Sequence, residues 1–281
     1  MIPDAPPAAT APTPPAASFA RRLLGDRLLR AAVLATLVVS LVLVAFPAID
    51  VAVARIFHHP GVAPLTEFPA EKIVALDRLR NAGMAVTRWA TILLVLALLA
   101  KLLAPLLARA VPTRNLLFLL ASLALGPGLM VNAFFKEVWG RPRPSETTLF
   151  GGPWEFVRAW VPGGACPTNC SFPSGEASGA AWLLALVFVV PERWRRTTLA
   201  LVVTWMTVIS LNRMAFGSHF LSDVTIGWGL MAIVVLLCRR LILEDLSEGP
   251  IDRIDRTLAR LGDRLLGLLG RRDRGGAPEH F

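Results

Sequence analysis

The chain has 281 residues, of which 54% are hydrophobic and 17% are charged, and its formal net charge is +9. The apolar share exceeds and the charged share falls below those of ordinary globular domains, which indicates a membrane protein. The basic residues lie beside apolar segments and not in a polar patch with interleaved aromatic residues, so we do not expect nucleic-acid binding.

The N-terminal end predicts a tail followed by a membrane anchor. Residues 1–18 are rich in Pro and Ala without a periodic apolar pattern, which predicts a disordered tail. A cluster of arginines between positions 21 and 30 precedes Ala31–Ala54, an apolar stretch long enough to cross a hydrocarbon layer of about 30 Å. A cleaved signal peptide would have a shorter apolar region, so we expect an uncleaved anchor.

Further apolar stretches predict an all-α membrane domain over residues 19–243, built as a six-helix transmembrane bundle. The five other predicted spans are Trp89–Ala108, Asn115–Phe135, Phe172–Val190, Thr197–Ala215 and Phe220–Cys238. The first outer loop contains residues 71–80, for which we predict a short helix at the interface. Arginines at the N-terminus and after the second, fourth and sixth spans fall on one side, which predicts that both termini are cytoplasmic.

The last segment, residues 244–281, predicts a basic amphipathic tail. Apolar residues recur there at alternating steps of three and four, with arginines between them: Ile251, Ile254, Leu258, Leu261, Leu265 and Leu268. This pattern favours a helix on the cytoplasmic membrane surface, where arginine meets anionic lipid. A coiled-coil segment that binds a partner is the competing interpretation.

Three segments at the outer ends of the spans carry residues that a membrane span does not need. They are Lys136–Pro144, Phe172–Ala177 and Asn212–Asp223. A phosphate site requires fixed cations, backbone N–H groups at the start of a helix, and a nucleophile with an orienting partner. Lys136, Arg143 and Arg213 offer the cations, Ser174 and Gly175 a helix start, and His219 and Asp223 share a helical face.

These segments resemble the type 2 phosphatidic acid phosphatase superfamily, whose motifs are Lys-x6-Arg-Pro, Pro-Ser-Gly-His and Ser-Arg-x5-His-x3-Asp. Lys136 with Arg143-Pro144, then Pro173-Ser174-Gly175, then Arg213 with His219 and Asp223 match in order and spacing. Three ordered motifs make a strong signal, whereas any one of them alone would be weak.

The resemblance implies a role for each matched residue. His219 attacks phosphorus to form a phosphohistidine, and Asp223 orients the imidazole. Lys136, Arg143 and Arg213 bind the phosphoryl oxygens, and Ser174 with Gly175 completes the cradle. Because the fixed cations stabilise the transition state, we expect no metal and no cofactor.

Two positions depart from the family pattern. Asn212 stands where the family has Ser, and Glu176 stands where it has the histidine that protonates the leaving group. A carboxylic acid acts as a general acid when burial keeps it protonated, so we predict that Glu176 replaces this histidine. Arg141 lies inside the first motif, and we expect it to be an exposed loop cation outside the site.

Cys166 and Cys170 lie close together in an outer loop that is rich in Gly and Pro. Two thiolates without further ligands make a poor metal site, so we predict a disulfide, which persists outside the cytosol.

The sequence thus predicts a metal-independent phosphatase of a phosphorylated membrane lipid in a bacterial inner membrane, with its active site facing the periplasm. Candidate substrates are lipid A phosphate, phosphatidic acid, phosphatidylglycerol phosphate and an isoprenyl pyrophosphate. One alternative is a phosphotransferase that passes the phosphoryl group to a second lipid. The other is a non-catalytic protein that binds or transports lipid phosphates.

Overall fold

The structure, a computed structural model, describes residues 23–61, 68–103 and 111–273. The tail predicted for residues 1–18 and the end of the second predicted span, residues 104–108, lie outside these ranges. Within the described ranges the chain forms helices and loops, with one isolated β-bridge between Thr147 and Trp154 and no strand. The predicted all-α membrane fold is confirmed.

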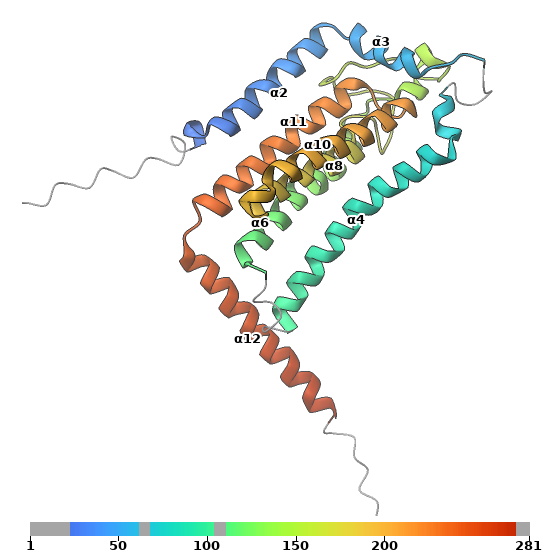
Figure 1. The fold of residues 1–281 in the computed structure, drawn as a ribbon. Coiled ribbons are helices and arrows are strands. Elements are labelled where there is room, and N and C mark those ends of the chain that lie inside the picture. Colours follow the sequence, from blue (N-terminus) through green and yellow to red (C-terminus); the bar gives the residue numbers. More distant parts are fainter. Residues whose placement is uncertain (1–22, 62–67, 104–110, 274–281) are drawn as a thin grey trace, which may run out of the picture.

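Long helices run side by side and short ones gather at one end of the bundle (Figure 1). The α-helices are α2 (Arg27–Ala45), α3 (Ala48–Phe57), α4 (Val74–Leu103), α6 (Thr113–Leu123), α7 (Lys136–Val138), α8 (Gly175–Trp182), α9 (Leu186–Val189), α10 (Glu192–Ala215), α11 (Leu221–Cys238) and α12 (Glu248–Asp273). The π-helical segments are η2 (Ala124–Phe135) and η6 (Arg239–Glu244), and the 3-10 turns are η1 (Pro69–Lys72), η3 (Pro144–Glu146), η4 (Thr148–Phe150) and η5 (Leu183–Ala185).

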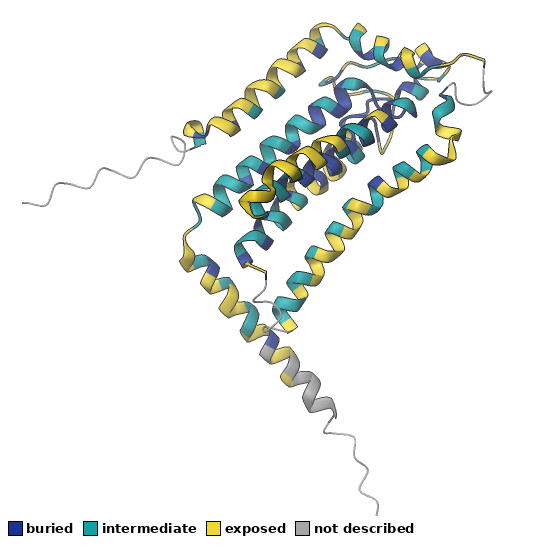
Figure 2. Cartoon of the chain, viewed as in Figure 1, coloured by how far each residue is buried: buried dark blue, intermediate teal, exposed yellow. Residues whose placement is uncertain are grey.

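Five helices in the described part of the chain are long and apolar enough to cross a membrane. They are Arg27–Ala45, Val74–Leu103, Thr113–Val138, Glu192–Ala215 and Leu221–Glu244, and the apolar helix Gly175–Val189 is shorter. The predicted count of six therefore stays a prediction. Burial is concentrated in the central helices and at the end of the bundle that holds the loops, whereas α2, α4 and α12 are largely exposed (Figure 2).

Two predicted boundaries were wrong. The first predicted span is two helices, because Pro47 lies between α2 and α3, and proline has no N–H to continue the helical hydrogen bonds. In place of the short helix predicted at the interface for residues 71–80, Glu71 and Lys72 end the 3-10 turn η1, and α4 is one continuous helix from Val74. The charged residues in the outer turns of α4 had suggested a separate helix at the interface.

The π-helical segment η2 carries the chain from α6 to the first phosphatase-like motif. Pro127 lies inside it and cannot donate a backbone hydrogen bond, so the regular helical pattern is interrupted. The side-chain amide of Asn132 donates to the carbonyl of Pro127 at 2.7 Å. This local rearrangement ends at Lys136, the first residue of α7.

Small residues let α8 pack closely against its neighbours, a common basis of helix association in membranes. A Cβ on Gly179 would lie 3.0 Å from Oγ1 of Thr87 in α4, and one on Gly227 in α11 would lie 2.9 Å from Oγ of Ser178. Below these contacts, Trp182, Met206 and Met231 belong to the main apolar core. The close packing fixes the start of α8 beside the starts of α4 and α11.

The helix predicted after the last span is present as α12 and contacts α4 and α6. Arg114 of α6 pairs with Glu248 at 3.0 Å, and the hydroxyl of Thr113 donates to Asp255 at 2.5 Å. Gly262 of α12 lies against the carbonyl of Leu102, which leaves no room for a Cβ. Part of α12 is thus held against the bundle.

The close contact between α8 and α11 yields a stability prediction. Gly227→Leu should lower the free energy of unfolding by about 1–3 kcal/mol, because the larger side chain overfills a packed contact. Gly249→Leu is the matched control, since no atom lies within 4 Å of a Cβ placed there. Thermal unfolding in detergent measures both variants, and equal melting temperatures would show that the contact is not tightly packed.

Candidate functional site

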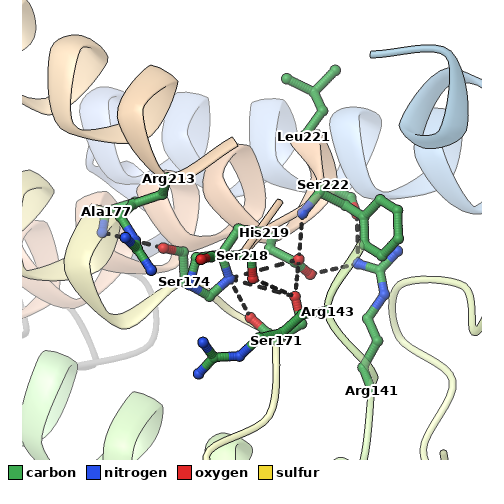
Figure 3. A network of polar contacts seen from close by, with 12 residues as sticks. Arg141, Arg143, Ser171, Ser174, Ala177, Arg213, Ser218, His219, Leu221 and Ser222 are labelled. Atoms are coloured by element: carbon green, nitrogen blue, oxygen red, sulfur yellow. Dashed lines mark hydrogen bonds and ion pairs between the residues drawn. The ribbon is translucent and has the colours of Figure 1, made fainter. Parts of the chain in front are cut away.

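The three motif segments meet at one end of the bundle (Figure 3). The N–H of Ser174 donates to the carbonyl of Asp223 at 3.0 Å, which joins the starts of α8 and α11. A Cβ on Gly175 would lie 2.9 Å from Cε of Lys136, so glycine is needed for the lysine to pass. The ion pair between Arg213 and Glu176 at 3.3 Å brings in the end of α10. The sequence-predicted residues thus lie together.

The imidazole of His219 has a defined orientation. Its Nδ1 lies 2.8 Å from the carbonyl oxygen of Ser171. A carbonyl oxygen only accepts hydrogen bonds, so Nδ1 carries the hydrogen and donates it. In the neutral imidazole the lone pair is then on Nε2. The side chain therefore presents its nucleophilic nitrogen away from Ser171.

Burial also keeps His219 neutral. Desolvation lowers the pKa of His219 to about 3, more than the neighbouring Asp223 raises it. The histidine lies in the short turn between α10 and α11, and its side chain is 2% exposed. At neutral pH the imidazole is uncharged, with hydrogen on Nδ1 and a free lone pair on Nε2. This is the form that can attack phosphorus.

Asp223 contacts His219 less directly than the sequence predicts. Its Oδ2 lies 3.8 Å from Nδ1 of His219, beyond hydrogen-bond distance. The same oxygen accepts from the hydroxyl of Ser171 at 2.5 Å and from the N–H of Phe220 at 2.7 Å. Ser171 therefore stands between the two residues, because its hydroxyl binds the carboxylate and its carbonyl binds the imidazole. Sequence reasoning missed this serine, which lies just before the second motif.

The prediction that Arg141 is an exposed loop cation was wrong. Arg141 is fully buried, donates to Oδ1 of Asp223 and pairs with Asp50 of α3 at 2.8 Å. It also donates to the carbonyl of Val157 at 2.8 Å and to the hydroxyl of Ser222 at 2.7 Å. Buried charges are tolerated when they are paired and hydrogen bonded, as here. An aspartate inside the first apolar stretch was the available signal.

The loop between Cys166 and Cys170 holds two of the predicted phosphate-binding cations. Asn169 accepts from Nζ of Lys136 at 2.9 Å through its side chain and from Nη2 of Arg143 at 2.9 Å through its carbonyl. Its backbone has a φ of 50°, a left-handed conformation that asparagine tolerates better than most residues. The structure pairs the two cysteines as a disulfide with their Cα atoms 5.8 Å apart. This loop thus sets the spacing between Lys136 and Arg143.

Arg213 has a buried donor without a partner among the described residues. Its Nη1 makes no hydrogen bond with them, whereas its Nε has only the ion pair with Glu176 at 3.3 Å. Buried polar groups of this kind usually have a ligand or water as partner. Ser174 caps α8 by accepting from the N–H of Ala177 at 3.3 Å, and the helix N-terminus favours an anion. Among the described residues, no group of three His, Cys, Asp or Glu side chains could hold a metal.

Glu176 lies in the first turn of α8 between two arginines. Oε1 lies 3.4 Å from Nε of Arg80 in α4, and Oε2 lies 3.3 Å from Nε of Arg213. Two ion pairs of this kind are typical of a carboxylate. The role of leaving-group acid therefore stays a prediction, and sequence reasoning missed Arg80.

The buried ion network predicts that Arg141 is essential for stability. Arg141→Gln should lower the free energy of unfolding by about 3–5 kcal/mol, because Asp50 and Asp223 would be left buried without their cation. Arg158→Gln is the control, since Arg158 is an exposed arginine of the same outer loop. Chemical denaturation in detergent measures both, and an unchanged Arg141→Gln midpoint would contradict the ion-network assignment.

The loop between Cys166 and Cys170 predicts an effect on activity with little effect on stability. Replacing Cys166 and Cys170 together by Ser should lower kcat/KM by about tenfold, the effect of one misplaced charged contact. The melting temperature should change little, because the closed ring is short. Mass analysis of the alkylated native protein checks the disulfide itself, and two free thiols would refute it.

Comparisons with known proteins identify the family of this chain. Residues 115–246 match the model of the PAP2 superfamily. The chain is 35% identical over 206 residues to a lipid A 4'-phosphatase from Rhizobium leguminosarum, covering 68% of this chain and 85% of the relative. It is 47% identical over 116 residues to the lipid A 4'-phosphatase of Rhizobium etli, covering 41% of this chain and 45% of the relative.

The fold has a counterpart among solved structures. The crystal structure of a transmembrane PAP2 type phosphatidylglycerolphosphate phosphatase from Bacillus subtilis superimposes with a TM-score of 0.50 at 15% sequence identity. The match covers 79% of this chain and 98% of the solved one. This match supports the arrangement of the helices, whereas the sequence relatives support membership of the family. The chain is a multi-pass membrane protein and belongs to the PAP2 superfamily.

Proposed function

We propose that this protein is a lipid phosphatase that removes a phosphate from a membrane-lipid head group through a phosphohistidine at His219. The observation that carries the proposal is the orientation of His219. Its Nδ1 donates to the carbonyl of Ser171, which leaves the Nε2 lone pair available, and nearby Arg213 has a buried donor, Nη1, without a hydrogen bond to the described residues. Relatives named as lipid A 4'-phosphatase and phosphatidylglycerophosphatase B support the substrate class.

The proposed reaction has two displacements. Nε2 of His219 attacks phosphorus, the bond between phosphorus and the lipid oxygen breaks, and the oxygen takes a proton from a water molecule and departs as an alcohol. The hydroxide left behind takes up the proton released in the second step. A water molecule then attacks the phosphohistidine, which releases inorganic phosphate and restores the imidazole. Asp223 stabilises the positive charge that develops on the ring, acting through Ser171 and over the 3.8 Å that separates it from Nδ1.

The phosphate would be held by side chains and by the start of α8. Lys136, Arg143 and Arg213 supply positive charge, and the Ser174 hydroxyl and the Gly175 N–H at the start of α8 supply further donors. In this scheme the fixed cations neutralise the transition state, so the reaction requires no metal. Nη1 of Arg213, which is buried and makes no hydrogen bond with the described residues, is suited to donate to a phosphoryl oxygen.

The site would face the periplasm of a bacterial inner membrane. Arg193, Arg195 and Arg196 lie at the start of α10, and Arg239 with Arg240 follows α11, at the ends opposite the site. Positive residues favour the cytoplasmic side, which supports a site on the opposite, periplasmic face. On the cytoplasmic side, the exposed basic part of α12 would contact anionic lipid.

The nucleophile is tested by replacing His219. His219→Ala should lower phosphate release by roughly 10³-fold or more, as expected when a covalent nucleophile is lost. His59→Ala is the control, because His59 is exposed and outside the motif segments. Phosphate release is measured in mixed micelles over lipid A, phosphatidic acid, phosphatidylglycerol phosphate and an isoprenyl pyrophosphate. Hydrolysis by His219→Ala at the rate of the parent would refute the assignment.

The same assay separates the alternatives. Adding a second lipid as acceptor distinguishes water from lipid as the phosphoryl acceptor, because a transferase would form a new phospholipid in place of inorganic phosphate. Tight binding of a lipid phosphate without any release or transfer would instead favour a binding protein. Quenching in an alkaline denaturant, which preserves the acid-labile P–N bond, followed by mass analysis should detect phosphate on His219 in the parent and none in His219→Ala.

A further inference from the structure

Both residues that depart from the family pattern contact the outer part of α4. Glu176 pairs with Arg80, as described above, and the side-chain amide of Asn212 donates to the carbonyl of Leu76 at 3.0 Å. Leu76 and Arg80 are one helical turn apart in α4. The two unusual side chains therefore fix the same turn of α4 beside the phosphate site.

Close helix packing also holds Arg80 in place. Gly83, three residues further along α4, is buried, and a Cβ there would lie 2.7 Å from Cδ1 of Ile209 in α10. Thr87, one turn beyond Gly83, lies against Gly179 of α8 in the same way. These close contacts with α8 and α10 thus bring the turn of α4 that carries Arg80 beside the start of α8.

The carboxylate of Glu176 is unfavourable for phosphate binding because it carries a negative charge at the proposed phosphate site. It lies 3.3 Å from Nε of Arg213, whose buried Nη1 has no partner among the described residues, and its negative charge would repel a phosphate bound there. Arg80 approaches the other carboxylate oxygen at 3.4 Å and is the more exposed partner, with 36% of its side chain accessible against 19% for Glu176. The arginine adds the positive charge that the glutamate removes.

We propose that Arg80 is a positioning residue that neutralises Glu176 and so leaves Arg213 available for the phosphate. This inference rests on the proposed function, because it takes the Arg213 donors to be the phosphate cradle. Glu176 acts here as a carboxylate that orders two arginines, and α4 becomes part of the site. The ligand class is unchanged, a phosphate monoester on a lipid or inorganic phosphate.

The proposal predicts a specific rescue. Arg80→Ala should weaken the binding of inorganic phosphate and lower kcat/KM by about tenfold, the scale of coupling between neighbouring charges. Adding Glu176→Gln to Arg80→Ala should restore most of the loss, because the repelling charge is gone. Glu176→Gln alone should leave phosphate binding equal or tighter, and Arg80→Lys should keep most of the activity.

The matched control is Arg78→Ala, since Arg78 is an exposed arginine in the same turns of α4. Phosphate binding is measured by calorimetry on the full chain in detergent, and kcat/KM on the lipid that gives the highest parent activity. Melting temperatures show whether each variant folds. If Arg80→Ala fails to fold, Arg80→Gln replaces it in the same cycle.

Two results would overturn the proposal. In the first, Glu176→Gln does not rescue Arg80→Ala, which would mean that Arg80 binds substrate directly or has no role. In the second, Glu176→Gln alone lowers hydrolysis by roughly 10²-fold with unchanged phosphate binding, which would identify Glu176 as the leaving-group acid. If the parent hydrolyses none of the lipids, the proposed function fails, while the phosphate-binding cycle still tests Arg80.

Discussion

The buried carboxylate of Asp223 is the constraint around which the site is organised. A fully buried charge is tolerated only when it is paired and hydrogen bonded, and Asp223 meets Arg141, the Ser171 hydroxyl and the Phe220 N–H. Arg141 in turn requires Asp50, which lies in α3 because Pro47 breaks the first apolar stretch. One buried charge thus ties together the N-terminal helices, the outer loop and the start of α11.

The cations of the site are held before any substrate arrives. Asn169 bonds to Lys136 and Arg143, and Glu176 pairs with Arg213, so their side chains are already ordered. Ordered donors reorganise little as charge develops on a phosphoryl group, which is the physical advantage of such a site. The same partners also compete with the phosphate, so the affinity of the site depends on how completely their own charges are offset.

Small residues make this convergence possible inside a membrane. Helices there gain little from burying apolar surface against one another, so close packing and hydrogen bonds hold them together. Gly179 and Gly227 permit α8 to approach α4 and α11 at distances that a side chain would block. The N-terminus of α8, with its free N–H groups, consequently lies beside residues from three other helices, and Gly175 leaves room for Lys136.

The sequence by itself determined the helical membrane class and predicted that His219, Asp223, Arg213, Ser174 and Lys136 lie close together. These predictions rest on local hydropathy and motif spacing, which can be recognised in a sequence without knowing how the helices pack. Only the tertiary structure decided the partners of Arg141, which is 91 residues from Asp50, and the pairing of Arg80 with Glu176, 96 residues away. Such pairs depend on which helix faces pack against each other. The glycine contacts that determine this packing leave no periodic signal in the sequence.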